Sequence, residues 1–357
     1  MPATPPRELS PNLDLLRAVA VISVFCAHLL RTATQDRGLG SLGRFGVILF
    51  FFHTSLVLMA SLQRLERTAP THISLALAFW IRRVFRIYPL AILPVALVAV
   101  LHIPSIPDEN YVWIGWKGFL SNAALVQNLT AKPDILGVLW SLPLEVQMYV
   151  LLPFAFLVIR GNRHYRSLAL LVISVVLAYA LPRIDSRLEV FHYAPCFTSG
   201  IVAFDLTRSR TWKWKLPAWV WPVGVLAAII MFGPHDDVDL GQKLHRAYVL
   251  TLLLGVLYAN VKESRSNGIH AISHWIAEHS YGIYLSHSVV LWMAIFRMER
   301  FPLWARVAAL VAGTIGIPAL LYVSIEKPLI LAGGHVARRL LRRATISAGS
   351  QPTQICS

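Results

Sequence analysis

The chain has little charge. Asp, Glu, Lys and Arg make up only 14% of its 357 residues, whereas roughly 25% is usual in soluble domains. Together with 56% hydrophobic residues, this composition indicates an all-α polytopic membrane protein. Cysteine is also rare, and the three cysteines lie far apart, at positions 26, 196 and 356. Their spacing excludes a disulfide framework and a cysteine metal cluster, and no redox chemistry is expected.

Acidic residues are outnumbered, because 18 Asp and Glu stand against 33 Lys and Arg, which gives a net charge of +15. This excess does not indicate a nucleic-acid partner, since such a protein would gather its basic residues on one soluble face. Most of the basic residues fall in short loops on one side of the expected membrane spans. We therefore expect a multi-pass protein of the bacterial inner membrane, in contact with anionic membrane lipid, with both termini in the cytoplasm.

Apolar runs predict about ten transmembrane helices in one membrane domain, residues 13–330, and the first helix is expected to stay in the mature protein. The expected spans are residues 13–31, 45–62, 87–103, 135–159, 167–182, 191–206, 217–233, 246–261, 276–296 and 304–325. Residues 117–130 are apolar but too short to cross, so we expect them at the outer interface. Residues 1–12 are expected to be a disordered cytoplasmic N-terminus. Residues 331–357 are expected to be a basic cytoplasmic tail whose first part is a helix on the inner leaflet.

The first span contains two ionisable side chains, Arg17 and His28, separated by ten apolar or small residues. At about 100° per residue, eleven steps return His28 to within roughly 20° of the face of Arg17, about 16 Å further along the helix. Ionisable groups at membrane depth are costly, so this shared face indicates a functional site. His28 is a candidate general base, or else a packing histidine. Arg17 needs an anionic partner, and Asp14 lies one turn earlier.

A second polar stripe lies in the fourth span. Glu145 has Ser141 and Tyr149 one turn to either side, and a buried carboxylate there must pair or stay protonated. We expect it to orient His28, to balance a cation or to form a structural pair. Trp140 is expected to shape this helix.

Two further groups have open roles. In the ninth span, Tyr281, Tyr284 and His287 either line an acceptor path or serve helix packing. Glu326, at the end of the tenth span, is expected to form a structural salt bridge. The role of His53 is open.

Arg83 and Arg86 are one helical turn apart, with Arg82 beside them. Two guanidinium groups on one face can hold one anion, and the phosphates of coenzyme A match them well. Ordinary basic residues on the cytoplasmic side are the alternative. No metal site and no tightly bound cofactor are expected.

Six segments resemble, in order and spacing, the membrane acyltransferase-3 family, which includes O-antigen and other cell-envelope acetyltransferases. The segments are Arg17-x10-His28, residues 46–55 (GVILFFFHTS), 82–89 (RRVFRIYP), 140–149 (WSLPLEVQMY), 280–287 (SYGIYLSH) and 325–328 (IEKP). The resemblance implies transfer of an acyl group, with acetyl expected, from acyl-CoA to a hydroxyl of a saccharide or glycolipid. It also implies a part for Arg17 in the catalytic motif and for the Arg83-x-x-Arg86 pair in binding the donor.

These expectations define the candidate site residues. Catalysis is assigned to His28, Arg17 and Glu145, with Arg82, Arg83 and Arg86 for the acyl-CoA (acetyl-CoA) co-substrate and Asp14, His53, Trp140, Ser141, Tyr149, Tyr281, Tyr284 and His287 for support or acceptor binding. The chain departs from the family at Ile48, where an acid is common, at His53, where an aliphatic is usual, and at Thr54-Ser55, where a Ser-Gly pair is common. These departures leave the acceptor open.

The rival function is a transporter that uses Arg17, His28 and Glu145 as an intramembrane relay. Transporters are often built from two related halves, and no internal repeat is evident. An inactive scaffold is a third reading. We expect the membrane domain alone to complete any transfer. The acyl chain, the oligomeric state and the existence of an acyl-enzyme intermediate are left open.

Overall fold

The computed structural model describes residues 10–34, 40–104, 114–161, 164–209, 215–233, 240–264 and 267–349, and these residues are predominantly helical. The α-helices are α1 (Pro11–Thr34), α2 (Gly40–Glu66), α3 (His72–Leu101), α4 (Gly115–Ala123), α5 (Ser141–Ile159), α6 (Tyr165–Ala180), α7 (Val190–Ser209), α8 (Val220–Phe232), α9 (Leu240–Asn260), α10 (Asn267–Trp292), α11 (Leu303–Leu321) and α12 (Lys327–Gly349). A 3-10 turn, η2 (Gly137–Trp140), leads into α5, and a π-helical turn, η6 (Tyr322–Glu326), joins α11 to α12. The predicted all-α class is confirmed.

Six helical stretches of the described residues are long and apolar enough to cross a membrane. They are Pro11–Thr34, Gly40–Glu66, His72–Leu101, Gly137–Ile159, Tyr165–Arg183 and Leu303–Ile346. All ten predicted spans fall on helices, but α8 has 13 residues, about 20 Å, against a hydrocarbon core of about 30 Å. Helices α7, α9 and α10 do not combine the required length with the required apolar content. The count of ten and the orientation of the termini stay predictions, and residues 1–9 and 350–357 of the two predicted tails lie outside the described residues.

Helix α3 begins at His72, well before the expected start near residue 87. The side chain of Thr71 accepts a hydrogen bond from the backbone N–H of Ser74, and Ser74 Oγ accepts one from the N–H of Thr71, both at 3.1 Å. This capping box starts the helix regardless of the charges that follow. Helix α3 therefore includes Arg82, Arg83 and Arg86. Their positive charge alone suggested a loop on the cytoplasmic side.

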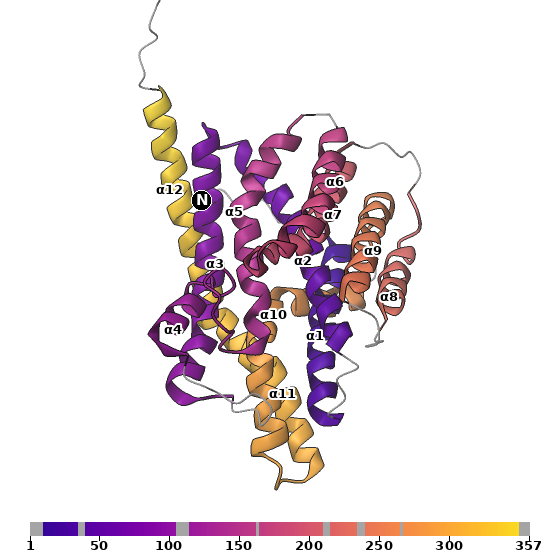
Figure 1. Ribbon diagram of the computed structural model, residues 1–357, viewed down its shortest axis with the longest axis vertical. Coiled ribbons are helices and arrows are strands. Elements are labelled where there is room, and N and C mark those ends of the chain that lie inside the picture. The colour runs from indigo at the N-terminus through magenta and orange to yellow at the C-terminus, as the bar shows by residue number, and fades with distance from the viewer. Residues whose placement is uncertain are drawn as a thin grey trace, which may run out of the picture.

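Helix α2 lies in the middle of the bundle and packs against α1, α5, α7 and α9 (Figure 1). Glycine permits the closest approaches. A side chain at Gly46 would come within 2.6 Å of the Ala20 carbonyl oxygen on α1, and one at Gly200 on α7 would overlap Ser55 and Phe52 of α2. The glycine that opens the 46–55 motif thus holds α1, with its two ionisable groups, against the core.

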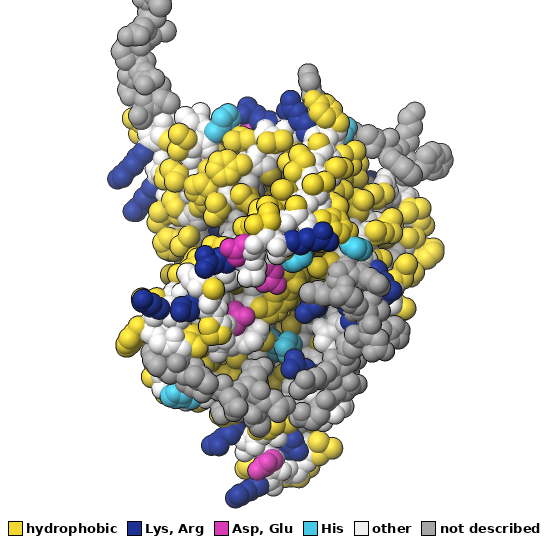
Figure 2. Space-filling model, in the orientation of Figure 1, with side chains coloured by type: hydrophobic (Ala, Val, Ile, Leu, Met, Phe, Trp, Pro, Cys, Tyr) yellow, Lys and Arg dark blue, Asp and Glu magenta, His cyan; other side chains and the backbone are white. Residues whose placement is uncertain are grey.

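The outer surface of α5 and α6 is apolar. Exposed side chains there include Leu151, Phe154, Val172, Ile173 and Val176. Figure 2 shows hydrophobic side chains spread over the upper half of the side of the molecule in view, with Lys and Arg at the upper edge. Such a surface is unfavourable in water and suits a lipid environment.

Helix α12 packs lengthwise against α3 and runs antiparallel to it (Figure 1). A side chain at Gly333 would come within 2.6 Å of Phe85 Cβ, and Ala337 and Leu341 are buried. The helix expected on the inner leaflet therefore packs against protein along its length, and its place relative to the membrane stays a prediction. The apolar stripe of this basic helix finds a protein partner, which sequence periodicity alone does not distinguish from lipid.

Candidate active site

Two polar side chains of α1 face α10. Arg17 Nε donates to Ser280 Oγ at 2.7 Å, and the His28 ring lies 5.0 Å, centroid to centroid, from the His287 ring. Ser280 and His287 belong to the same helix, so Arg17 and His28 share one face of α1. The common face predicted from the eleven-residue spacing is confirmed.

Asp14 does not hold Arg17. Its Oδ2 accepts a hydrogen bond of 2.8 Å from His274 Nδ1 on α10. The Arg17 guanidinium instead interacts electrostatically with Arg86, Glu326 and Glu145. Arg86 repels it, so its anionic neighbours are Glu326 of η6 and Glu145 of α5, and not a residue of its own helix.

Glu145 lies at the centre of this group. Tyr149 donates a hydrogen bond to its Oε1, and Thr54 Oγ1 lies 3.5 Å from the same oxygen. Its charge interacts with those of Arg17, Arg86 and Arg83. These contacts agree with one of the three expected roles of Glu145, the balancing of a cation. None of them is with His28.

Arg86 is paired within the protein. Its Nη2 lies 3.5 Å from Glu326 Oε1, and the Glu326 side chain is 0% exposed. Neither carboxylate oxygen of Glu326 has a hydrogen bond in the described part of the chain. The expected salt bridge of Glu326 is confirmed, and it occupies one of the arginines that the sequence assigns to the donor. The π-helical turn at residues 322–326 presents this carboxylate to α3.

Three further candidates lie on α2, α3 and α10 near these charges. His53 is buried on α2 and interacts electrostatically with Arg17 and Arg86. Tyr281 donates to the carbonyl of Ile87 at 2.8 Å. The Arg83 guanidinium lies over the Phe79 ring, 5.9 Å from its centroid.

His287 has a defined tautomer. Its Nδ1 lies 2.6 Å from the Tyr284 carbonyl oxygen, and because a carbonyl only accepts, Nδ1 carries the proton. Nε2 therefore presents a lone pair, and this buried atom has no hydrogen-bond partner among the described residues. The His28 ring lies beside it, with the two ring centroids 5.0 Å apart and the rings tilted by 57°. The two rings therefore lie in contact, with the unpaired nitrogen on His287.

The start of α5 closes this end of the site. Tyr284 donates to the Val138 carbonyl at 2.6 Å, and its hydroxyl lies 2.8 Å from Ser141 Oγ. Trp140 packs against Tyr193 of α7, with ring centroids 5.5 Å apart. The structure therefore divides the predicted site residues into a charged group around Arg17 and a histidine pair about three helical turns away.

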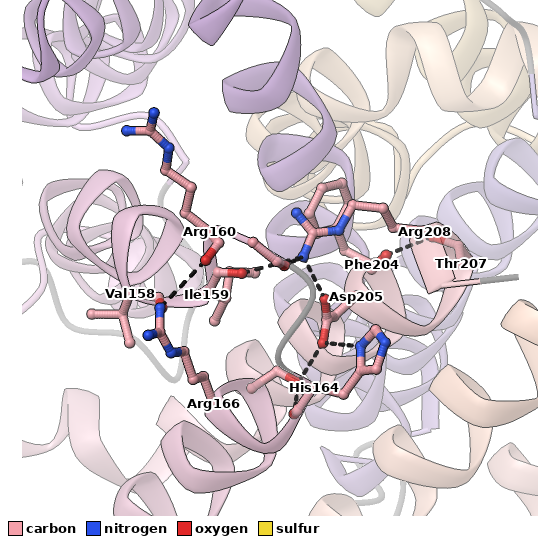
Figure 3. A network of polar contacts seen from close by, with 11 residues as sticks. Val158, Ile159, Arg160, His164, Arg166, Phe204, Asp205, Thr207 and Arg208 are labelled. Atoms are coloured by element: carbon pink, nitrogen blue, oxygen red, sulfur yellow. Dashed lines mark hydrogen bonds and ion pairs between the residues drawn. The ribbon is translucent and has the colours of Figure 1, made fainter. Parts of the chain in front are cut away.

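A second polar network joins the ends of α5, α6 and α7 (Figure 3). Asp205 is 1% exposed and accepts from Ser167 Oγ at 2.9 Å, from His164 Nδ1 at 2.9 Å and from Arg208 Nη2 at 2.8 Å. Arg208 also donates to the Ile159 carbonyl at 3.2 Å. Because both carboxylate oxygens have protein donors, we assign this network to helix connection and not to chemistry.

The chain is similar to two curated acyltransferases. Acyltransferase MdmB of Streptomyces mycarofaciens is 28% identical over 173 residues, which cover 44% of this chain and 42% of MdmB. Peptidoglycan O-acetyltransferase OatA of Listeria monocytogenes serovar 1/2a is 24% identical over 369 aligned residues, covering 90% of this chain and 56% of OatA. The chain thus spans about half the length of these relatives. No solved structure matches it.

The family comparison covers nearly the whole chain. The acyltransferase-3 family, described as an acyltransferase domain, matches residues 10–323. This range contains Arg17, His28, Arg86, Glu145 and His287, the residues whose contacts form the two parts of the site. The chain therefore belongs to the acyltransferase-3 family of membrane acyltransferases.

Proposed function

We propose that this protein moves an acyl group, with acetyl expected, from acyl-CoA to a hydroxyl of a cell-envelope saccharide or glycolipid at the bacterial inner membrane. The family supports acyl transfer in a membrane. The similarity to OatA, a peptidoglycan O-acetyltransferase, supports an envelope saccharide as acceptor and acetyl as the transferred group.

The reaction would take place at His28. Its neutral ring removes the proton of the acceptor hydroxyl while the hydroxyl oxygen attacks the thioester carbonyl carbon. The carbon–sulfur bond then breaks, and the coenzyme A sulfur leaves with the proton that His28 returns. We assign His287 a positioning role, because its ring lies 5.0 Å from the His28 ring, centroid to centroid, and its Nε2 has no other partner among the described residues.

One observation carries the proposal. Between the arginines of α3 and the histidine pair, polar side chains follow one another along α1 and α10 through an apolar bundle. The series is Arg86 with Glu326, Arg17 with Ser280, Tyr284 with Ser141, and His287 with His28. Polar groups at such depth are expensive unless they serve a path. A donor held at the arginines could extend its arm along this series to His28.

The two parts of the site have different tasks in this proposal. Arg17 and His28 are about 16 Å apart along α1, so they cannot act on one carbonyl. Arg17 and Glu145 would hold the polar part of the donor, and His28 would act at the acyl carbon.

A purified-enzyme assay tests the proposal. Thioester loss from acetyl-CoA is measured with fragments of the cell's envelope glycans as acceptors. Wild-type protein is expected to turn over only with acceptor, His28→Ala to be inactive, and His245→Phe, an exposed histidine of α9, to retain activity. Uptake of a solute into liposomes without any acyl-CoA would instead identify the transporter, and absence of both activities would identify a scaffold.

A further inference from the structure

A crevice of about 360 Å³ opens between the end of α5 and the start of α6. Its lining includes Arg166 and the apolar side chains of Leu157, Ala169, Leu170 and Ile173. Ile173 is 52% exposed, so the crevice lies on the apolar outer surface of these two helices. A molecule that fills it must be apolar over most of its length.

The charged end of the crevice lies at the end of a candidate membrane span. The stretches Gly137–Ile159 and Tyr165–Arg183 are both long and apolar enough to cross a membrane, and Arg166 is in the first turn of α6. From there, Ala169, Leu170 and Ile173 follow on the same helix face, over about 10 Å. The crevice is thus cationic where a span would meet the lipid headgroups and apolar at greater depth.

The Arg166 guanidinium is held in place by the end of α5. Its Nη1 donates to the Val158 carbonyl at 3.1 Å and to the Arg160 carbonyl at 3.3 Å (Figure 3). Carbonyls at a helix end have no partner within the helix, so these two bonds satisfy them. A guanidinium has five N–H groups, and the N–H groups on Nε and Nη2 make no hydrogen bond within the described residues.

The neighbouring arginines have carboxylate partners. Arg160 pairs with Glu66 at 2.9 Å, and Arg208 pairs with Asp205 at 2.8 Å. Within the described residues, Arg166 forms no ion pair with a carboxylate. An arginine stays charged at every physiological pH, and the Nε and Nη2 pair of N–H groups matches two oxygens of a phosphate. Arg166 therefore favours an anionic ligand from outside the protein.

We propose that this crevice binds one anionic phospholipid, with its phosphate on Arg166 and one acyl chain between Leu157 and Ile173. Charge and apolar surface occur together in such a lipid, and basic pockets between membrane helices suit anionic headgroups. A free phosphate would leave the apolar part of the crevice empty. The site is separate from the candidate active site and does not depend on the proposed acyl transfer.

The test is a titration of phosphatidylglycerol into the full chain in a neutral detergent, with the Kd measured by native mass spectrometry. Arg166→Gln is expected to raise this Kd about tenfold through loss of the charge-assisted bonds. Ala169→Phe, at an exposed position, keeps the charge but fills the crevice, and a similar loss is expected. Arg339→Gln removes an equal charge from an exposed position of α12 and is expected to stay within about twofold.

Two competing molecules separate the headgroup from the chain. Wild type is expected to bind phosphatidylcholine at least about fivefold more weakly, because the choline cation opposes Arg166, and Arg166→Gln is expected to lose this preference. Glycerol 3-phosphate, which has no acyl chain, is expected not to displace phosphatidylglycerol at equal concentration.

Several results would overturn the site. They are an equal loss in Arg166→Gln and Arg339→Gln, an unchanged Kd in Ala169→Phe, equal wild-type affinity for the two lipids, and displacement by glycerol 3-phosphate. If Arg166→Gln does not fold because α5 loses its two end contacts, Ala169→Phe and the two competitors still decide the proposal.

Discussion

Replacing Arg86 with methionine removes the partner of a buried carboxylate. Arg86 and Glu326 approach to 3.5 Å, with side chains 17% and 0% exposed. At an effective dielectric constant of about 20, two unit charges at this distance attract by about 5 kcal/mol, and loss of one partner of a buried pair costs about 3–5 kcal/mol. Because Arg17 also interacts with Glu326, we expect Arg86→Met to lower the free energy of unfolding by about 3 kcal/mol.

A double variant separates the ion pair from other effects of the substitution. Arg86→Met combined with Glu326→Leu removes both charges and leaves no uncompensated carboxylate. Replacement of a buried pair by apolar residues is often neutral, so the double variant is expected within about 1 kcal/mol of wild type. The assay is equilibrium unfolding in mixed micelles with increasing SDS, followed by tryptophan fluorescence. If the double variant loses as much unfolding free energy as the two single variants together, the ion pair does not contribute and the reasoning is refuted.

Three further predictions concern the rest of the molecule. His287→Phe is expected to lower kcat about 100-fold, and His287→Gln, which keeps a hydrogen-bond acceptor, to retain at least a tenth of wild-type kcat; equal rates in the two variants would show that the acceptor has no role. Glu145→Gln keeps the shape but removes the charge near Arg17, so kcat/KM for acetyl-CoA is expected to fall about tenfold, and an unchanged value would remove Glu145 from the site. Asp205→Asn weakens three charge-assisted contacts and is expected to lower the unfolding free energy by about 2 kcal/mol with kcat unchanged; a lower kcat in folded protein would contradict a purely connecting role.

Helix positions and the common face of Arg17 and His28 were predictable because both depend on local spacing. Ten apolar runs fall on helices, and an eleven-residue separation on one helix has a fixed angle. The start of α3 could not be predicted in this way. The apolar run begins only after the arginines, whereas a capping box at Thr71 starts the helix earlier.

Contacts between side chains of different helices could not be predicted from the sequence. The Arg17–Ser280 contact joins residues 263 positions apart, and Asp14 pairs with His274 although Arg17 lies nearer in sequence. Likewise, nothing in the basic pattern of residues 327–349 indicates that α12 packs on α3. Such pairings follow from tertiary packing, which periodicity does not encode.

Mass spectrometry of envelope glycans tests the central claim most directly. Cells lacking the gene are compared after complementation with the wild-type chain or with His28→Gln. The account predicts that wild type restores an acyl increment, of acetyl size, on one glycan or glycolipid and that His28→Gln does not. Identical glycans with and without the gene, or full restoration by His28→Gln, would contradict an acyltransferase that works through this histidine.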